Sequence, residues 1–287
     1  MLSILNSISS LNAENALSST QSSLQKVLTE LSTGLKINSG SDDAAGLSIA
    51  NGLQANISAL TQSSQNASDG VGLLQTADGA LSQVTTLLNR AVTLATEASN
   101  GGLSTSQSDA LNTEYQSILT EIGNIGSTTN FNGTAVFGTG GAGSSATVYT
   151  SDGTTGGSNT TTTTIAGLTT ALLGLTSTVD TTPGTTTATD LSTAAGAQSA
   201  LTAITAAIST VAADRGAIGA SVNQLTATSN VENTEVTNLT SAQNTVQNAD
   251  VGQTVAQMTQ YNVLEQTGMA ALSQSNQAQQ AVLKLLQ

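Results

Sequence analysis

Few side chains in this chain could carry chemistry, because the sequence contains no cysteine and no histidine. Thiol nucleophiles, Ser-His relays, imidazole metal ligands and structural zinc are therefore excluded within the chain. Lys+Arg total 5 against Asp+Glu 18, and the resulting net charge of -13 disfavours binding to nucleic acid or to anionic membranes. We expect no cofactor, no bound metal and no enzymatic activity.

The carboxylates that remain lack catalytic or metal-binding spacing. Asp42 and Asp43 are adjacent, and adjacent helix residues do not face each other, so we expect them to cap a helix rather than to form an acid/base pair. Asp152, Asp180 and Asp190 lack the spacing of a calcium loop.

The elements that position side chains in this chain are long helices. Residues 201–246 repeat side chains at alternating spacings of three and four, a pattern that requires partner helices. Ten of the fourteen positions are apolar. Arg215 and Glu232 interrupt the pattern, either as polar contacts that set helix register or as residues that drift off the contact surface. The full set is Leu201, Ile204, Ile208, Val211, Arg215, Ile218, Val222, Leu225, Ser229, Glu232, Val236, Leu239, Gln243 and Val246.

The N-terminal half offers the partners. One stripe has the same spacing, with Ser64, Asp78 and Thr85 as polar gaps: Leu53, Ile57, Leu60, Ala67, Val71, Leu74, Leu81, Leu88, Val92 and Ala95. A shorter pattern adds a third helix: Leu111, Tyr115, Ile118, Ile122 and Ile125. One helix over residues 44–100 would be roughly 85 Å long at about 1.5 Å per residue, so we predict a mainly α fold, a helical rod or coiled-coil bundle of the N- and C-terminal segments.

Local signals place the ends of these helices. We expect Ser41 to be the N-cap of the long helix and its C-terminus to be a left-handed cap near Gly101 and Gly102. Ser104 and Gln107 form a capping box for the following helix. The last long helix begins near Asp190 and breaks at residues 248–252.

Residues 138–190 are rich in Thr and Gly. Short alternations such as Ala146, Val148 and Thr150 predict a small β-hairpin that turns near Asp152 and Gly153, with surface loops around it. We expect the hydroxyls of Asn159-Thr-Thr and of residues 160–164 to lie exposed in a loop; glycosylation is the alternative.

Both ends of the chain are amphipathic and nearly neutral. We predict that residues 1–40 and 246–287 are largely disordered in the monomer and fold on assembly, because an amphipathic helix without a partner is marginal in water. No stretch approaches the roughly 18 to 20 apolar residues of a membrane span. The start lacks a positive region before an apolar run, so we expect no general secretory signal.

Three motifs resemble bacterial flagellin. LSTGLKINSGSDDAAGLSIANGL at 31–53 and SDGVGLLQTADGAL at 68–81 are similar to its N-terminal signature. NLTSAQNTVQNADVGQTVAQMTQYNVLEQTGMAALSQSNQAQQAVLKLL at 238–286 is similar to its C-terminal counterpart. The resemblance covers residues 1–137 and 195–287. It implies a secreted, extracellular, self-assembling subunit of the flagellar filament that serves motility.

The same resemblance implies a domain division and partners. Residues 1–42 and 246–287 would pair as an inner coiled coil, and residues 43–245 would form a helical rod that includes the hairpin region, with no large outer domain. The chain would be exported by the flagellar type III apparatus with a chaperone, and would meet the filament cap and hook-junction proteins. The expected subunit-packing residues are Leu24, Leu28, Leu31, Val255, Met258, Leu264, Leu272 and Leu285.

One further site follows from the resemblance. NRAVTLATEASN at 89–100, with Glu114, is similar to the flagellin site recognised by the mammalian Toll-like receptor, in which Arg90, Leu94 and Glu114 match and Asn89 replaces Gln. The alternative is that Arg90 is a solvated charge paired with an acid.

Two other functions remain open. A hook-filament junction protein shares the terminal helices of flagellin. A surface binding protein or adhesin built on a flagellin rod would use the Thr-rich middle as its binding face.

Overall fold

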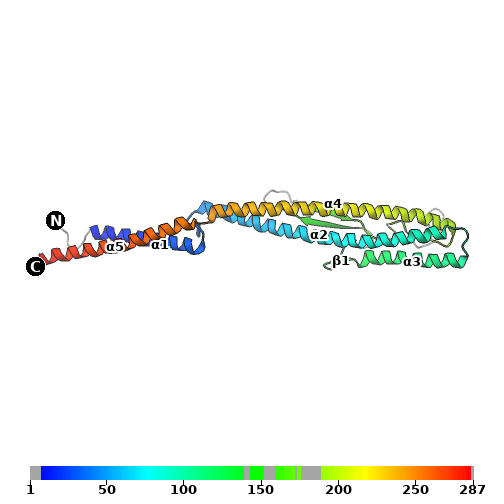
Figure 1. Cartoon of the computed structure of the whole chain (residues 1–287), viewed down its shortest axis with the longest axis horizontal. Coiled ribbons are helices and arrows are strands. Elements are labelled where there is room, and N and C mark those ends of the chain that lie inside the picture. Colours follow the sequence, from blue (N-terminus) through cyan, green and yellow to red (C-terminus); the bar gives the residue numbers. More distant parts are fainter. Residues whose placement is uncertain (1–7, 139–142, 152–159, 172, 176–188, 286–287) are drawn as a thin grey trace. The chain divides into compact units, whose positions relative to one another are not determined.

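The computed structural model describes residues 8–138, 143–151, 160–171, 173–175 and 189–285. It is mainly α with two small hairpins, as the sequence predicts (Figure 1). The elements are α1 (Ile8–Thr33), α2 (Ala44–Ala98), α3 (Thr105–Thr128), β1 (Asn130–Phe131), β2 (Thr134–Ala135), β3 (Ser144–Tyr149), β4 (Thr160–Ile165), α4 (Ala194–Gln247) and α5 (Val251–Leu285). The chain forms two compact units, residues 1–55 with 237–287 and residues 56–236.

In the second unit, 56–236, α2 presents three rows of side chains seven residues apart. This width lets one helix pack against several partners at once. Two rows are buried: Leu60, Ala67, Leu74, Leu81, Leu88 and Ala95, and beside them Ser63, Gly70, Ala77, Val84, Ala91 and Ala98. The third is half-buried and holds the predicted polar gaps: Ile57, Ser64, Val71, Asp78, Thr85 and Val92. The predicted stripe is therefore confirmed.

Helix α4 runs antiparallel to α2 and buries a matching row. Its members are Ala197, Ile204, Val211, Ile218, Leu225 and Glu232, again seven residues apart. Contacts between Asp78 and Arg215 and between Ser63 and Glu232 show the antiparallel order, because the numbers fall along α4 as they rise along α2.

Helix α3 completes the helical part of this core. Its N-terminus has the predicted capping box, in which the Ser104 N–H donates to Gln107 Oε1 at 2.9 Å. Its buried face carries Tyr115, Ile118, Leu119 and Ile122.

Strands β3 and β4 form the predicted hairpin, antiparallel from Ser144↔Ile165 to Tyr149↔Thr160. The predicted turn at Asp152 and Gly153, and Asn159, lie outside the described residues. The expectation of an exposed loop at 160–164 is wrong, because these threonines form β4 and alternate between exposed and buried positions. Thr161 and Thr163 are buried, since β4 covers the helical core with one face.

A second hairpin, β1–β2, was not predicted. Its strands pair Asn130 with Ala135 and Phe131 with Thr134. Asn132 and Gly133 form the turn with φ values of 50° and 78°. An Asn-Gly pair is the strongest short signal for a turn with two positive φ angles, so the signal was present in the sequence.

Two predicted helix ends need correction. The N-cap of α2 is Asp43 rather than Ser41: the Gly46 N–H donates to Asp43 Oδ1 at 2.9 Å. Helix α2 ends at Ala98, and neither Gly101 nor Gly102 has a positive φ. The predicted break between α4 and α5 is confirmed, and Asp250 caps α5 by accepting from the Gly252 N–H at 2.9 Å.

Helix α4 differs from the sequence expectation on membrane spans. Among the described residues it is the one helix long and apolar enough to cross a bilayer, and 28% of the qualifying stretch is buried. The buried row of α4 belongs to the core of the second unit. A core helix can be as long and as apolar as a membrane span, so these two properties do not distinguish the two.

The close approach at Gly126 gives a stability prediction. A Cβ on Gly126 would lie 2.0 Å from the Leu168 carbonyl oxygen, so Gly126→Ala should displace backbone and destabilise the chain by about 1–3 kcal/mol or more. Gly123 lies on the same helix with nothing within 4 Å. Gly123→Ala should be neutral or stabilise by up to about 1 kcal/mol. Thermal unfolding followed by circular dichroism measures both, and equal melting temperatures would contradict the packing at Gly126.

Candidate interaction surfaces

Helices α1 and α5 form an antiparallel pair in the first unit (Figure 1). The hydroxyls of Ser10 and Ser275 lie 2.9 Å apart, and Gln21 Nε2 donates to Glu265 Oε1 at 3.2 Å. Leu17 packs against Gly268. The pair is thus aligned along most of its length.

Two backbone hydrogen bonds, which we call the backbone clamp, join the segment after α1 to the segment before α5. The Lys36 N–H donates to the Gln247 carbonyl at 2.7 Å, and the Ala249 N–H donates to the Gly34 carbonyl at 2.9 Å. Gly34 follows α1 directly and has a φ of +73°, a backbone conformation that glycine adopts readily. The clamp fixes both connections, 34–43 and 248–250, where they meet.

The first unit buries few apolar side chains. In its described part the fully buried ones are Val27, Ile37 and Ala50. Nine of the eleven exposed large apolar side chains of the described chain belong to this unit, and we call these nine the terminal apolar surface. They are Ile8, Leu11, Leu28, Ile49, Val251, Val255, Val263, Leu264 and Met269. Ile8 is 74% exposed and Val251 57%.

Five residues of the terminal apolar surface lie on α5, and they are distributed around this helix rather than along one side of it. At about 100° per residue, Val251, Val263 and Leu264 point in three directions roughly 100–140° apart. Apolar side chains that point in several directions from one helix need partners on several sides to be buried. One partner helix, α1, cannot cover three directions, so several neighbours are needed.

The predicted packing residues have mixed exposure. Leu28, Val255 and Leu264 are exposed. Leu24, Leu31, Met258 and Leu272 are half-buried. The Leu285 side chain lies outside the description. None of the seven described side chains is fully buried, so all can take part in further contacts.

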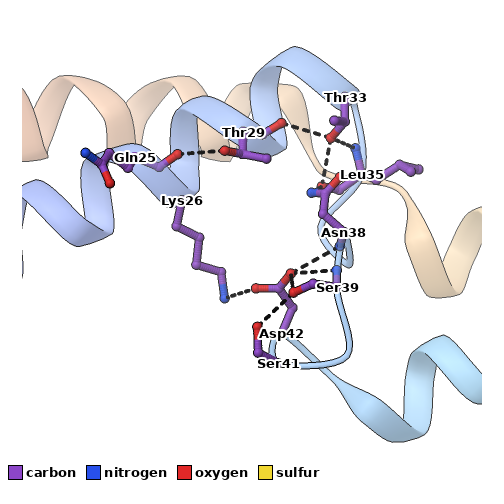
Figure 2. Close-up of polar contacts among 9 residues, drawn as sticks. All are labelled: Gln25, Lys26, Thr29, Thr33, Leu35, Asn38, Ser39, Ser41 and Asp42. Atoms are coloured by element: carbon purple, nitrogen blue, oxygen red, sulfur yellow. Dashed lines mark hydrogen bonds and ion pairs between the residues drawn. The ribbon is translucent and has the colours of Figure 1, made fainter.

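Asp42 organises the connection between α1 and α2 (Figure 2). Its Oδ2 accepts from the N–H groups of Asn38 and Ser39 at 3.2 and 3.0 Å and from the Ser39 hydroxyl at 3.0 Å. Its Oδ1 lies 3.0 Å from Lys26 Nζ on α1. Asp42 therefore caps a turn and ties it to α1, while Asp43 caps α2, so the helix-capping prediction holds for Asp43 and not for Asp42.

These contacts change the ionisation of both partners. The hydrogen bond from Lys26, followed by those from Ser39 and Asn38, lowers the pKa of Asp42 to about 2. The same ion pair raises the pKa of Lys26. Because the folded pKa of Asp42 lies below its ordinary value of 3.8, its contribution to stability is complete above about pH 4 and is lost as the pH falls towards 2.

Both interruptions of the α4 pattern meet polar side chains of α2, Arg215 at the predicted gap Asp78 and Glu232 at Ser63 beside the predicted stripe. Arg215 Nε donates to Asp78 Oδ1 at 2.7 Å, and Glu232 Oε1 accepts from the Ser63 hydroxyl at 2.5 Å. The hydroxyls of Ser64 and Ser229 lie 2.9 Å apart. Glu232 is 4% exposed, so it has not drifted off the contact surface. The register-setting interpretation is the one that this geometry favours.

The structure brings two of the three receptor-site residues together. Arg90 Nε and Nη2 both lie 2.7 Å from Glu114 Oε1, and both side chains are about half exposed. Leu94, one turn along α2, is fully buried. Arg90 is thus both exposed and paired with an acid, whereas Leu94 belongs to the core.

No group of His, Cys, Asp or Glu side chains in the described ranges could hold a metal ion.

Comparison with known proteins agrees with this geometry. A model described as the bacterial flagellin N-terminal helical region matches residues 4–140, and one described as the C-terminal helical region matches residues 201–286. The chain belongs to the bacterial flagellin family.

Individual curated flagellins match about half of the chain's length. Flagellin of Serratia marcescens is 45% identical over 137 residues, which cover 47% of this chain and 39% of that protein. Phase 1 flagellin of Salmonella naestved is 43% identical over 137 residues, covering 47% of this chain and 27% of that one. The crystal structure of Bacillus cereus flagellin aligns with a TM-score of 0.48 at 30% identity, over 58% of this chain and 88% of that chain. The alignments with the curated flagellins thus span well under half of their length.

The ion pair of this flagellin at Asp42 can be tested directly. Lys26→Met should raise the pKa of Asp42 towards its ordinary value, because the hydrogen bond from Lys26 is the main cause of its depression. Carbon NMR of the Asp42 carboxyl, titrated between about pH 6 and 1.5, measures the midpoint. Lys36→Met is the matched control, since Lys36 Nζ instead donates to the Thr245 carbonyl at 3.4 Å. An Asp42 midpoint that stays near 2 in Lys26→Met would contradict the assignment.

Proposed function

We propose that this chain is a structural subunit that assembles with copies of itself into the filament of the bacterial flagellum and has no catalytic function. The observation that carries the proposal is the terminal apolar surface. All of its residues lie in the two segments of the chain that match the flagellin family models. No observation favours a hook-filament junction protein or an adhesin.

The energy available from this surface supports assembly with several neighbours. Burying a large apolar side chain completely stabilises by about 1.5–3 kcal/mol, so nine side chains that are roughly half exposed offer on the order of 10 kcal/mol. Association of two proteins costs an estimated 4–15 kcal/mol. One neighbour that covers a third of the surface would gain about 3 kcal/mol, less than the lowest estimate of that cost, whereas neighbours on several sides together would gain an amount within its range.

The geometry of the surface favours an open polymer. Contacts that repeat between different patches without closing generate a helical filament. We assign residues 1–42 and 246–287 to an inner coiled coil and residues 43–245, with the hairpin region 138–190, to the surrounding layer without a large outer domain. The pairing of α1 with α5 supports this division. Residues 1–40 and 246–287 would order only on assembly.

Secretion to the extracellular filament requires partners that recognise the unassembled chain. We propose the flagellar export apparatus, with a chaperone that covers the C-terminal segment, and contacts with the filament cap and hook-junction proteins. The exposed side chains of α5 support the chaperone proposal, because they would otherwise promote premature association.

A host Toll-like receptor is a further proposed partner. Arg90 and Glu114 would form the charged contact, and Leu94 would hold α2 in place from the core.

The polymerisation proposal makes a deletion prediction. Removal of residues 250–287 should abolish filament growth from seeds and leave a soluble, helical protein, because most of the terminal apolar surface lies on α5. Electron microscopy and circular dichroism measure the two outcomes. Within the full chain, Val263→Asp should also stop elongation, whereas Val231→Asp should not, although Val231 is more exposed, at 65% against 53%. Filaments from the truncated chain would refute the proposal.

The receptor proposal makes a separate prediction. Arg90→Ala should reduce signalling in a Toll-like receptor reporter assay without lowering the melting temperature, because exposed ion pairs contribute about 0–1 kcal/mol. Leu94→Ala should lower stability by about 2–5 kcal/mol. Glu114→Ala should reduce signalling in the same way as Arg90→Ala. Its control is Glu121→Ala, which removes another exposed acid of α3. Full signalling by Arg90→Ala would contradict the role of this pair.

A further inference from the structure

A groove in the second unit lies beside the two hairpins. It has a volume of about 480 Å³ and runs between β3, β2 and the α2 segment from Asn66 to Leu73. Val148 of β3 packs on Gly70, and the Phe131 ring packs on Gly72, so the hairpins contact different sides of α2. The floor between them is formed by Asn66, Asp69 and Leu73.

The groove follows the edge of β3 that pairs with no other described strand; at its end Asn66 Nδ2 donates to the Tyr149 carbonyl at 3.4 Å. All six residues Ser144–Tyr149 line it, although successive residues of a strand point to opposite faces. No residue of β4 lines it, and β3 pairs with β4 alone among the described strands. Residues of both faces can line one space only along the edge. The opposite wall, Thr134 to Val136, is also a run of consecutive residues.

An exposed strand edge is a template for pairing with another strand. A partner strand alongside β3 would be about six residues, or roughly 20 Å, long and would lie about 4.8 Å from β3. It would give the two-stranded hairpin, which is marginal by itself, a third strand. One face of the added strand would rest on Leu73 and Gly70, and β-branched or other apolar residues suit those positions.

Charge determines the kind of partner. Asp69 is the ionisable acid among the lining residues, and it is exposed. The chain itself has a net charge of -13, and the four Lys and Arg side chains that the structure describes are engaged: Lys26 with Asp42, Arg90 with Glu114, Arg215 with Asp78, and Lys36 with a carbonyl. A second copy would therefore bring further negative charge to Asp69, whereas a basic segment would complement it.

We propose that this groove binds an extended segment of another protein, which adds as a strand to the β3 edge, places apolar side chains at alternate positions on α2, and sets a Lys or Arg against Asp69. Backbone pairing supplies most of the affinity in this mode of recognition, and the side-chain positions supply the specificity.

Three synthetic seven-residue peptides test the proposal on the full-length chain. The first alternates threonine and valine and carries one lysine; the second replaces the lysine with glutamate; the third replaces the central residue with proline. Amide hydrogen exchange should show that the lysine peptide protects Ser144–Tyr149, that the glutamate peptide binds about tenfold more weakly, and that the proline peptide gives no protection.

Asp69→Asn should remove the difference between the lysine and glutamate peptides without changing the melting temperature. Asp109→Asn, an exposed acid on α3 outside the groove, should preserve it. The proposal is overturned if the lysine peptide gives no protection, if both charged peptides bind equally to the unaltered chain, or if the protected amides lie elsewhere. Protection of Ser144–Tyr149 that rises with protein concentration without peptide would assign the groove to a second copy and would also overturn it.

Discussion

The antiparallel packing of α2 against α4 is the interaction on which the second unit depends. Rows of side chains seven residues apart meet along both helices, and the rows of α2 are wide enough to serve α3 and the hairpins as well. Many of the residues in the second α2 row are small, Gly70, Ala77, Ala91 and Ala98 among them, which lets neighbouring elements approach closely. Because Asp78 with Arg215 and Ser63 with Glu232 pair in one alignment, a slip of one heptad would leave Arg215 and Glu232 without these partners. Glu232 is buried, so the loss of its partner Ser63 is costly, whereas the Asp78–Arg215 pair is partly exposed and adds little; both pairs thus specify register more than they add stability.

In the first unit two helices, α1 and α5, also pack along their length, but no further described element covers the pair as α3 and the hairpins cover α2 and α4. Helices α1 and α5 cover each other on one side, while apolar side chains on the other sides of α5 stay in contact with water. Two polar contacts align the pair, the half-buried hydroxyls of Ser10 and Ser275 and the exposed side chains of Gln21 and Glu265. A typical hydrogen bond adds only about 0.5–1.5 kcal/mol to stability. The two units thus differ: the second closes a core within a single chain, whereas in the proposed assembly the apolar surface of the first would be covered by neighbouring copies.

The sequence predicted the parts of the structure in which buried side chains recur at a regular spacing. The stripes of α2 and α4 were identified correctly because burial on a helix leaves a repeat of three and four. The threonines of β4 left no such signal, since buried Thr161 and exposed Thr162 are the same residue type, and only the helical core beneath distinguishes them. The role of Glu232 could not be decided because its partner Ser63 lies beside the predicted stripe rather than on it. Similarly, Ser41 and Asp43 are both good caps, and the turn built around Asp42 decides between them.

Charge explains why apolar contacts must dominate in the proposed assembly. Between residues 41 and 283 the chain has two cations, Arg90 and Arg215, and each is paired with an acid of its own chain. Few positive groups remain to attract another copy, so neighbouring subunits with a net charge of -13 repel one another. Salt screens charges beyond about 8 Å at physiological ionic strength, which weakens this repulsion while leaving apolar burial intact. The same excess of negative charge lets the terminal apolar surface remain exposed without indiscriminate aggregation, because association succeeds only where many apolar side chains are covered at once.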